Sequence, residues 1–338
     1  MRNGLLVVST ENSINIGDYI QGLSAKQYFD KIDEYIEREQ LNKNRKSNIR
    51  IIMNGWYMHH PDNWPPSTFI NPLFVAFHIN SVARDSLLSE RSISYLKTKE
   101  PIGCRDIETA ELLKAKGVNA YFSGCLTLTL GLKYKSKEKE NKSYFVDPYY
   151  KLSKRPYNLV VYLLYLFVNY KTINCISRKK FSNCSVKSLL KTACFFKSYK
   201  KIFSKDLLLN SEYISHEGLF LKGKYKSNDE LFHYAEELIH KYSKASLVIT
   251  SRIHCALPCL GLETPVIYVE NKEQSETSKC RLKGLIELLN VIPYSHGKLI
   301  KDNFNKKISL LNIPKNKKTW EKIAFELKKT CEKFVNKQ

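Results

Sequence analysis

Short apolar runs alternate along this chain with longer segments of helical periodicity, and this alternation restricts the folds that the chain can adopt. The apolar runs predict buried strands at residues 4–8, 50–56, 73–79, 102–106, 118–122, 143–148, 211–216, 245–250 and 265–269. Helical patterns lie between them, at 18–28, 107–116, 227–242, 251–260 and 320–335. Strands that alternate with helices are typical of parallel sheets covered by helices. We therefore expect an α/β fold built from two halves of doubly wound type.

Polar residues mark where several of these helices begin and end. Asp18 is the expected N-cap of the first helix, and Asp106 is the expected N-cap of the helix that stops at Gly117. Ser227 and Glu230 form a capping-box pattern at the start of the next long helix.

The chain of 338 residues is long enough for two domains, each with a core of its own. A lysine-rich polar stretch at 133–142 predicts a linker between them. We expect an N-terminal domain over residues 1–140 and a C-terminal domain over 141–312, with a helical insert at about 155–205. A closing helix is expected within 313–338.

Most of the positive charge falls in one stretch of the sequence. The net charge is +22, and residues 133–205 alone carry 18 basic and 3 acidic side chains. Within this stretch, the apolar run Asn158–Asn169 is flanked by Lys and Arg on both sides. One interpretation is a buried helix with a solvated lysine-rich edge, and another is contact of 151–205 with an anionic membrane surface. Nucleic acid is not expected as a partner, because no nucleic-acid-binding motif accompanies the charge.

The sequence argues against several classes of protein. No apolar run reaches the ~20 residues of a membrane-spanning helix, and the first residues do not have the pattern of a signal peptide. The nine cysteines are scattered, without a Cys-x-x-Cys pair, which is typical of reduced thiols in a cytosol. His59 and His60 have no matching cluster of ligands, so no metal site is expected. We expect a cytoplasmic protein.

The segment Thr250–His254 carries the strongest chemical signal. It places Arg252 and His254 just beyond the carboxyl end of a buried strand, at the start of a helix with Pro258 expected in its first turn. A helix N-terminus and a guanidinium attract phosphate or carboxylate, and an imidazole transfers protons near neutral pH. The alternative is structural: a salt-bridged arginine, and a histidine that caps the helix or packs in the core.

Two further polar turns in the first half follow strands in the same way. Arg105 lies at the end of the segment 102–106, and the turn Asn15-Ile-Gly-Asp18 follows the first strand. Ligands of open α/β sheets bind at the carboxyl ends of the strands. These turns therefore predict a cleft between the two halves.

Taken together, these motifs resemble the polysaccharide pyruvyl transferase family. The resemblance covers most of the chain and is weakest over 133–205. It rests on Asn15-Ile-Gly-Asp18, on Gly103-Cys-Arg-Asp106 with the helix that follows, and on Thr250-Ser-Arg-Ile-His254 followed by Gly261-Leu-Glu-Thr-Pro265. The chain departs from the family at Ser123-Gly-Cys-Leu126, where many members have an Asp-Pro pair.

The resemblance implies two Rossmann-like domains in an arrangement like that of the GT-B glycosyltransferases. It implies transfer of a pyruvyl group from phosphoenolpyruvate to two hydroxyls of a cell-surface polysaccharide or its lipid-linked precursor. The product is a pyruvate ketal, phosphate is released, and no cofactor or metal is implied. A lipid-linked acceptor implies a cytoplasmic protein that is peripheral at the inner face of the membrane, with 151–205 as the contact.

The resemblance and the residue chemistry together assign candidate roles. His254 and Asp18 are candidates for acid–base catalysis, because the reaction moves protons to carbon and away from hydroxyls. Phosphoenolpyruvate carries a phosphate and a carboxylate, so at least two cationic groups are expected to hold it. The donor-binding candidates are Arg252, Arg105, Asn15 and Gly17, and the acceptor-side candidates are Asn54, Trp56, His216 and Glu217.

Two other functions are compatible with the same residues. A GT-B-type glycosyltransferase would use Arg252 to hold the diphosphate of a nucleotide sugar. A non-catalytic glycan-binding protein of the same fold would bind no donor, and substitution of His254 would affect only its stability.

Overall fold

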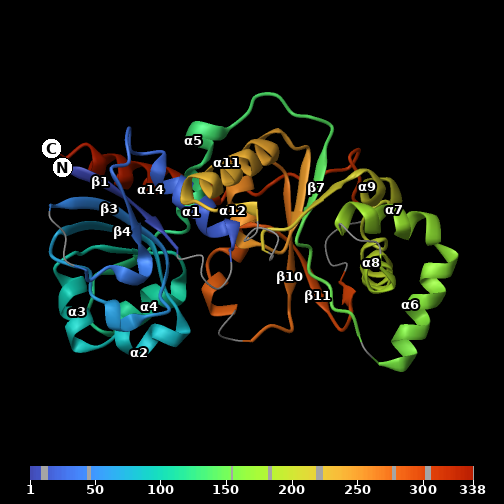
Figure 1. Ribbon diagram of the computed structural model, residues 1–338, viewed down its shortest axis with the longest axis horizontal. Coiled ribbons are helices and arrows are strands. Elements are labelled where there is room, and N and C mark those ends of the chain that lie inside the picture. The colour runs from blue at the N-terminus through green and yellow to red at the C-terminus, as the bar shows by residue number, and fades with distance from the viewer. Residues whose placement is uncertain are drawn as a thin grey trace.

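The computed structural model of the chain contains two sheets of six strands each, which lie next to each other along the molecule (Figure 1). The structure describes residues 1–8, 14–43, 47–153, 155–181, 185–217, 224–275, 279–300 and 306–337. The strands of both sheets are parallel except for one edge strand. This confirms the predicted α/β class and is consistent with two Rossmann-like domains.

The N-terminal sheet is parallel throughout, in the order β2-β1-β3-β4-β5-β6. Its strands are β1 (Arg2–Val7), β2 (Glu34–Glu37), β3 (Ile49–Tyr57), β4 (Ile70–Ile79), β5 (Ile102–Cys104) and β6 (Ala120–Phe122). The chain adds β2 on one side of β1 and β3 on the other. This reversal leaves a crevice at the carboxyl ends of β1 and β3, where open α/β sheets bind ligands.

The C-terminal sheet repeats this plan, in the order β12-β11-β10-β9-β7-β8. Its strands are β7 (Ser143–Val146), β8 (Glu212–Ile214), β9 (Leu247–Thr250), β10 (Val266–Asn271), β11 (Asn290–Ser295) and β12 (Lys298–Leu299). Here the reversal lies between β7 and β9. The two sheets therefore each contribute one crevice.

Helices cover the sheets and lie between them (Figure 1). Outside the segment between β7 and β8 they are α1 (Ile16–Lys26), α2 (Arg84–Leu87), α3 (Glu90–Lys97), α4 (Ile107–Ala115), α5 (Gly131–Tyr134), α11 (Asn228–Lys244), α12 (Ile253–Gly261) and α14 (Trp320–Val335). The predicted caps Asp106 and Ser227 are confirmed, since each side chain accepts a hydrogen bond from a backbone N–H in the first turn of its helix.

The prediction that Asp18 caps the first helix is wrong. Asn15 is the N-cap of α1: its backbone is extended, and its Oδ1 accepts a hydrogen bond from the N–H of Gly17 at 3.0 Å. Asparagine caps a helix as well as aspartate does, so the earlier of the two polar residues starts the helix. Asp18 lies inside the first turn and its carboxylate is available for other contacts.

The prediction that Pro258 lies in the first turn of its helix is also wrong. α12 begins at Ile253, and the backbone of His254 departs from helical geometry, with φ −81° and ψ 15°. Pro258 has no N–H to donate to the carbonyl of His254, four residues earlier. The helix is therefore interrupted at His254 rather than at the proline.

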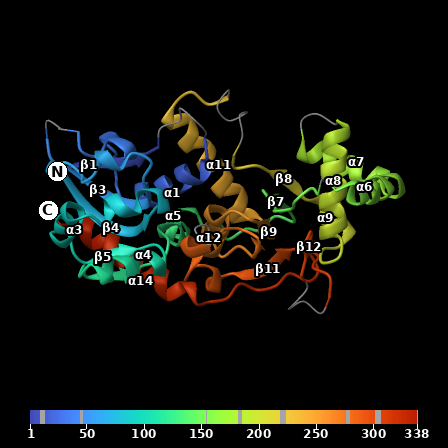
Figure 2. The same cartoon turned by 90° about the horizontal axis from the view of Figure 1, so that it is seen from below.

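Among the described residues between β7 and β8, four helices form the end of the molecule farthest from the N-terminal sheet (Figures 1 and 2). They are α6 (Pro156–Val168), α7 (Tyr170–Lys180), α8 (Val186–Tyr199) and α9 (Lys205–Asn210). In the described parts of the chain, no single helix is long and apolar enough to cross a bilayer. α6 and α7 together have sufficient length and apolar composition, but they are bent by 102° relative to each other.

The C-terminal helix α14 returns to the N-terminal half, so that the two chain ends lie near each other (Figures 1 and 2). Its residues Trp320, Leu327 and Cys331 are buried in a core that also contains residues of α1, α11 and α12. This shared core joins the two halves. The segment Ser123-Gly-Cys-Leu126, where the chain departs from the family pattern, contributes Cys125 and Leu126 to the same core.

Candidate active site

A cavity of about 840 Å³ lies between the two halves, at the carboxyl ends of the strands, where the sequence predicts a cleft. The N-terminal ends of three helices, α1, α4 and α12, border it. The residues of these three ends that line the cavity are Asn15, Gly17, Asp18, Arg105, Glu108, Arg252, Ile253 and His254. Unpaired N–H groups and the positive end of the helix dipole make such ends favourable for an anion.

Arg105 provides a buried positive charge in this cavity. The residue is 4% exposed, and its guanidinium makes no hydrogen bond or ion pair with the residues that the structure describes. Its backbone N–H donates to the carbonyl of Phe77 at 2.8 Å, which holds it at the end of β5. Burial lowers the pKa of the guanidinium, but arginine remains protonated in proteins. A buried charge of this kind is stabilised by a counter-charge, so the position favours an anionic ligand.

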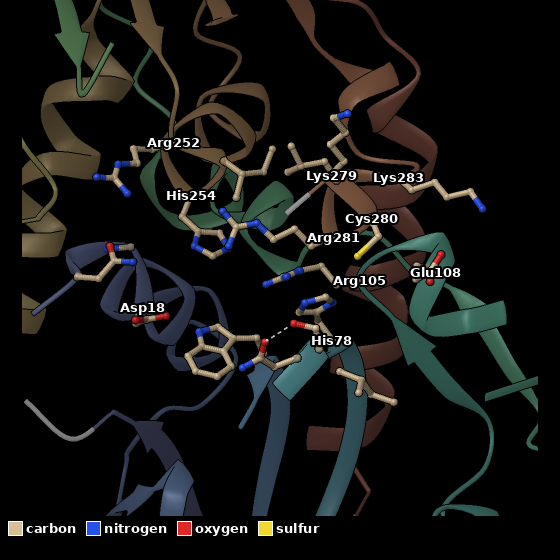
Figure 3. Close-up of a pocket in the computed structure, with 18 of the residues that line it drawn as sticks. Asp18, His78, Arg105, Glu108, Arg252, His254, Lys279, Cys280, Arg281 and Lys283 are labelled. Atoms are coloured by element: carbon tan, nitrogen blue, oxygen red, sulfur yellow. Dashed lines mark hydrogen bonds between the residues drawn. The ribbon is translucent and has the colours of Figure 1, made fainter. Parts of the chain in front are cut away.

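Arg281 brings a second guanidinium to the same place. It lies in the 3₁₀ turn Cys280–Leu282 (η5) and makes no ion pair within the described part of the chain. Figure 3 shows its side chain next to those of Arg105 and His254. Two like charges held close together repel each other, which a ligand with two negative groups would relieve.

Arg252 also lines the cavity, but its guanidinium is already paired. Nε donates to Asp147 at 3.0 Å, and Nη1 and Nη2 donate to the two carboxylate oxygens of Glu217 at 2.7 and 2.8 Å. Burial alone would lower the pKa of Arg252, but these two carboxylates outweigh it and raise the pKa. Arg252 thus has the salt-bridged geometry of the structural alternative, and it could hold a donor only after releasing Glu217.

His254 presents one ring nitrogen to the cavity. Its Nδ1 lies 3.2 Å from Nε2 of Gln21, and the same amide nitrogen donates to Asp18 Oδ1 at 3.2 Å. Because this amide N–H donates, Nδ1 accepts and the proton of the neutral ring is on Nε2. Nε2 is buried and has no partner among the described residues. Burial, followed by the charges of Arg105 and Arg281, lowers the pKa of His254 well below 6.5, so the ring is a neutral hydrogen-bond donor.

In His78 the proton is on the other ring nitrogen, Nδ1. His78 is the next-to-last residue of β4, and its Nδ1 lies 2.6 Å from Oδ2 of Asp106, a fully buried carboxylate. Asp106 also accepts the N–H of Thr109 as the N-cap of α4, so its orientation is fixed. Burial, and then Arg105, lower the pKa of His78 to about 4. Because Nδ1–H is bonded to Asp106, the free lone pair is on Nε2, as in a general base.

A distortion of the sheet directs the side chain of His78 toward the cavity. The pairing of β3 with β4 shifts register between Met53 and Gly55, and Ala76 of β4 has a positive φ of 55°. The hydroxyl of Ser123 accepts the N–H of Ala76 at 3.0 Å and donates to the carbonyl of Cys104 at 3.0 Å. Such bulges change the direction in which the following side chains point.

Five of the other predicted site residues line the cavity. They are Asn15, Gly17, Trp56, His216 and Glu217. A Cβ added at Gly17 would lie 3.2 Å from the Cβ of His254, so glycine lets the two helix ends approach closely.

Asn54 does not line the cavity, which corrects its prediction as an acceptor-side residue. Its amide is buried and donates to the carbonyl of Gln21 at 2.9 Å, which ties β3 to α1. His216 reaches the cavity wall, but its Nε2 is bonded to the hydroxyl of Tyr242 at 2.7 Å. It is therefore part of the wall rather than a free proton carrier.

Two residues of the site, His78 and Arg281, are not among those predicted from the sequence. The sequence pattern could have indicated His78, because it is a polar residue near the end of a buried apolar run. Arg105 and Arg252 are predicted as site residues on the same criterion. Arg281 has no such signal, because it lies in a 3₁₀ turn that only the folded chain brings to the cavity. Across the described residues, no group of three or more His, Cys, Asp or Glu side chains is arranged to hold a metal ion.

The fold and the cavity together define an α/β protein with a cationic site between two Rossmann-like halves. The family model of the polysaccharide pyruvyl transferases matches residues 15–273, and the chain belongs to this family. This confirms the resemblance seen in the motifs, and the family is one of transferases that act on polysaccharide. A search of curated proteins gives no match. A crystal structure of a functionally uncharacterized protein from Klebsiella pneumoniae aligns with 82% of this chain and 87% of its own, at 13% identity and a TM-score of 0.43.

The buried histidines predict that the protein is less stable in mild acid. Burial lowers the pKa of His78 and His216 to about 4 from an ordinary value of 6.5, and lowers that of His254 as well. Between these pH values the unfolded chain binds protons that the folded chain does not. The free energy of unfolding therefore falls as the pH falls through this range, by up to about 1.4 kcal/mol per pH unit for each histidine.

Urea unfolding measured at several pH values between 6.5 and 4 tests this. We expect His216→Gln to make the dependence shallower, because glutamine does not titrate. His233→Gln is the control, since His233 is exposed on α11 and should leave the slope unchanged. Equal slopes for wild type and His216→Gln would contradict the prediction.

Proposed function

We propose that this protein transfers the pyruvyl group of phosphoenolpyruvate to two hydroxyls of a cell-surface polysaccharide or its lipid-linked precursor, forming a pyruvate ketal. The observation that supports this most is the pair Arg105 and Arg281, which make no ion pair within the described residues and lie in a cavity bordered by three helix N-termini. Phosphoenolpyruvate carries its phosphate and its carboxylate on the same carbon. Two neighbouring guanidinium groups match these two anions.

The reaction balances with donor, acceptor and protein groups alone. A proton adds to C3 of the donor, C2 becomes electrophilic, and the first hydroxyl attacks C2 and loses its proton. The bond from C2 to the phosphate oxygen then breaks, the second hydroxyl attacks, and its proton leaves on the phosphate. The site therefore needs one acid, one base and a donor of hydrogen bonds to the leaving phosphate. We propose no cofactor for these steps.

Asp18 is our candidate for the acid that protonates C3. Burial raises the pKa of its carboxyl, although Arg38 and then Arg105 oppose this. A bound donor with several negative charges raises it further, so that the carboxyl holds a proton to deliver. Gln21 holds Asp18 and His254 next to each other, through bonds of 3.2 Å to each.

His78 and His254 then have complementary roles. His78, held by Asp106, accepts the proton of the attacking hydroxyl on Nε2, and Asp106 stabilises the imidazolium that forms. His254 donates Nε2–H to the leaving phosphate, which matches its buried, unpartnered nitrogen next to Arg105. The base is therefore His78, which is not among the residues predicted from the sequence, and His254 acts as a hydrogen-bond donor to the phosphate.

Calorimetry with phosphoenolpyruvate tests the proposed function without knowledge of the acceptor. We expect the wild type to bind it and to bind a nucleotide sugar far more weakly. His254→Asn should bind the donor less tightly, because one hydrogen bond to its phosphate is lost. Clear binding of a nucleotide sugar without binding of phosphoenolpyruvate would support the glycosyltransferase instead. Binding of a glycan alone, unaffected by His254→Asn, would support the non-catalytic protein.

A further inference from the structure

The outer face of α6 is apolar and exposed. Six of its side chains are between 51% and 85% exposed and follow one another at helical spacing: Tyr157, Val160, Leu163, Leu164, Phe167 and Val168. We call these six residues the α6 stripe. Monomeric proteins rarely expose a contiguous apolar surface of this kind unless it binds something.

Packing inside the protein accounts for only the other face of this helix. Tyr162 is buried in the core of the C-terminal half, and Leu159, Tyr165 and Leu166 pack against that core. The ten residues from Leu159 to Val168 include no charged side chain and no polar group other than two tyrosine hydroxyls. A helix at the surface of a soluble protein normally has a polar face toward water, and α6 has none.

The surroundings of the α6 stripe are strongly basic. Residues 148–205 contain 13 Lys and Arg and no Asp or Glu. The ammonium group of Lys200 on α8 lies 4.4 Å from the ring centre of Tyr165, so positive charge reaches α6 itself. A second copy of this chain would bring the same positive charge to the contact, which argues against a dimer through this face.

We propose that the α6 stripe docks this protein on a lipid bilayer whose surface carries anionic headgroups. Such a surface offers negative charge for the lysines and an apolar layer just beneath for the exposed side chains. α6 has 13 residues and is about 20 Å long, less than the ~30 Å of a bilayer core, so it lies in the interface. α7 turns away from α6 by 102°, and near its end Arg178 and Lys179 are exposed, whereas the ammonium group of Lys180 lies 4.3 Å from the ring centres of Tyr150 and Phe195. This inference rests on surface chemistry and not on the proposed reaction.

Flotation with lipid vesicles tests the docking directly. We expect the wild type to float with vesicles that contain phosphatidylglycerol and not with pure phosphatidylcholine. The double variant Leu164→Ser/Phe167→Ser should bind at least about tenfold more weakly, because two exposed apolar side chains no longer enter the interface. Arg155→Gln/Lys171→Gln, with Arg155 directly before α6 and Lys171 in the first turn of α7, should also bind more weakly, with less sensitivity to salt.

Phe325→Ser is the matched control, because Phe325 is 62% exposed on α14, at the opposite end of the molecule from α6 (Figure 1). It should float like the wild type, and circular dichroism should show that all variants are folded. Failure of the wild type to float with anionic vesicles overturns the proposal. So does undiminished flotation of Leu164→Ser/Phe167→Ser. A dimer of wild type that this double variant abolishes, without vesicle binding, would assign the α6 stripe to a second copy instead.

Discussion

Replacement of Arg105 by glutamine is expected to abolish binding of phosphoenolpyruvate and to leave the folded protein at least as stable as the wild type. Arg105 is buried without an ion pair in the described structure, so burial of its charge opposes folding when no ligand is bound, and the nearby charges of Asp106 and Asp18 offset this only in part. Glutamine keeps a polar end and removes the charge. Calorimetry should show an affinity for phosphoenolpyruvate that is at least about 100-fold lower, as expected when two charge-assisted hydrogen bonds are lost. Urea unfolding should show no loss of stability.

The controls separate the anion site from the rest of the protein. Arg281→Gln should weaken donor binding as well, because it removes the second guanidinium from the cavity. Arg91→Gln, on the exposed surface of α3, should bind like the wild type. If Arg105→Gln binds phosphoenolpyruvate normally, the anion site lies elsewhere. Arg252 would then be the first candidate, after movement of Glu217.

The second large effect is expected from Asp106→Asn, which separates two roles of one side chain. Asp106 caps α4 through the N–H of Thr109 at 2.9 Å and holds His78 at 2.6 Å. Asparagine is an equally good N-cap, so α4 and the fold should be retained. It has no charge to stabilise an imidazolium at His78. We expect kcat for pyruvyl transfer to fall by about 100-fold or more, with little change in donor affinity.

A double-mutant comparison shows whether the two residues act as one unit. If Asp106 acts through His78, the variant His78→Gln/Asp106→Asn should be no slower than His78→Gln alone. If the factors by which the two substitutions lower kcat multiply in the double variant, Asp106 affects the rate by another route, such as the position of α4. A normal rate for His78→Gln would exclude His78 as the base.

Most of the fold could be predicted from the sequence because hydrophobic patterns are local. The nine predicted strands correspond to β1 and to β3–β10, and all of these except β8 contain buried apolar residues. The strands that escape prediction lie at or next to sheet edges: β2, β11 and β12. β2 and β12 have only four and two residues, and the sequences of all three strands mix polar and apolar residues, so they lack a clear pattern. The domain boundaries at 140 and 312 stay a prediction.

The sequence by itself also determined where Arg105, Arg252 and His254 stand, since a polar residue after a buried strand lies at the ligand-binding edge of a sheet. Only the tertiary structure decided what each can do there. Asp147 pairs with Arg252 across 105 positions of sequence, and Asp106 pairs with His78 across 28. No carboxylate among the described residues pairs with Arg105 in the same way. Charge pairing depends on which loops the two sheets bring together, and a local pattern contains no information about that.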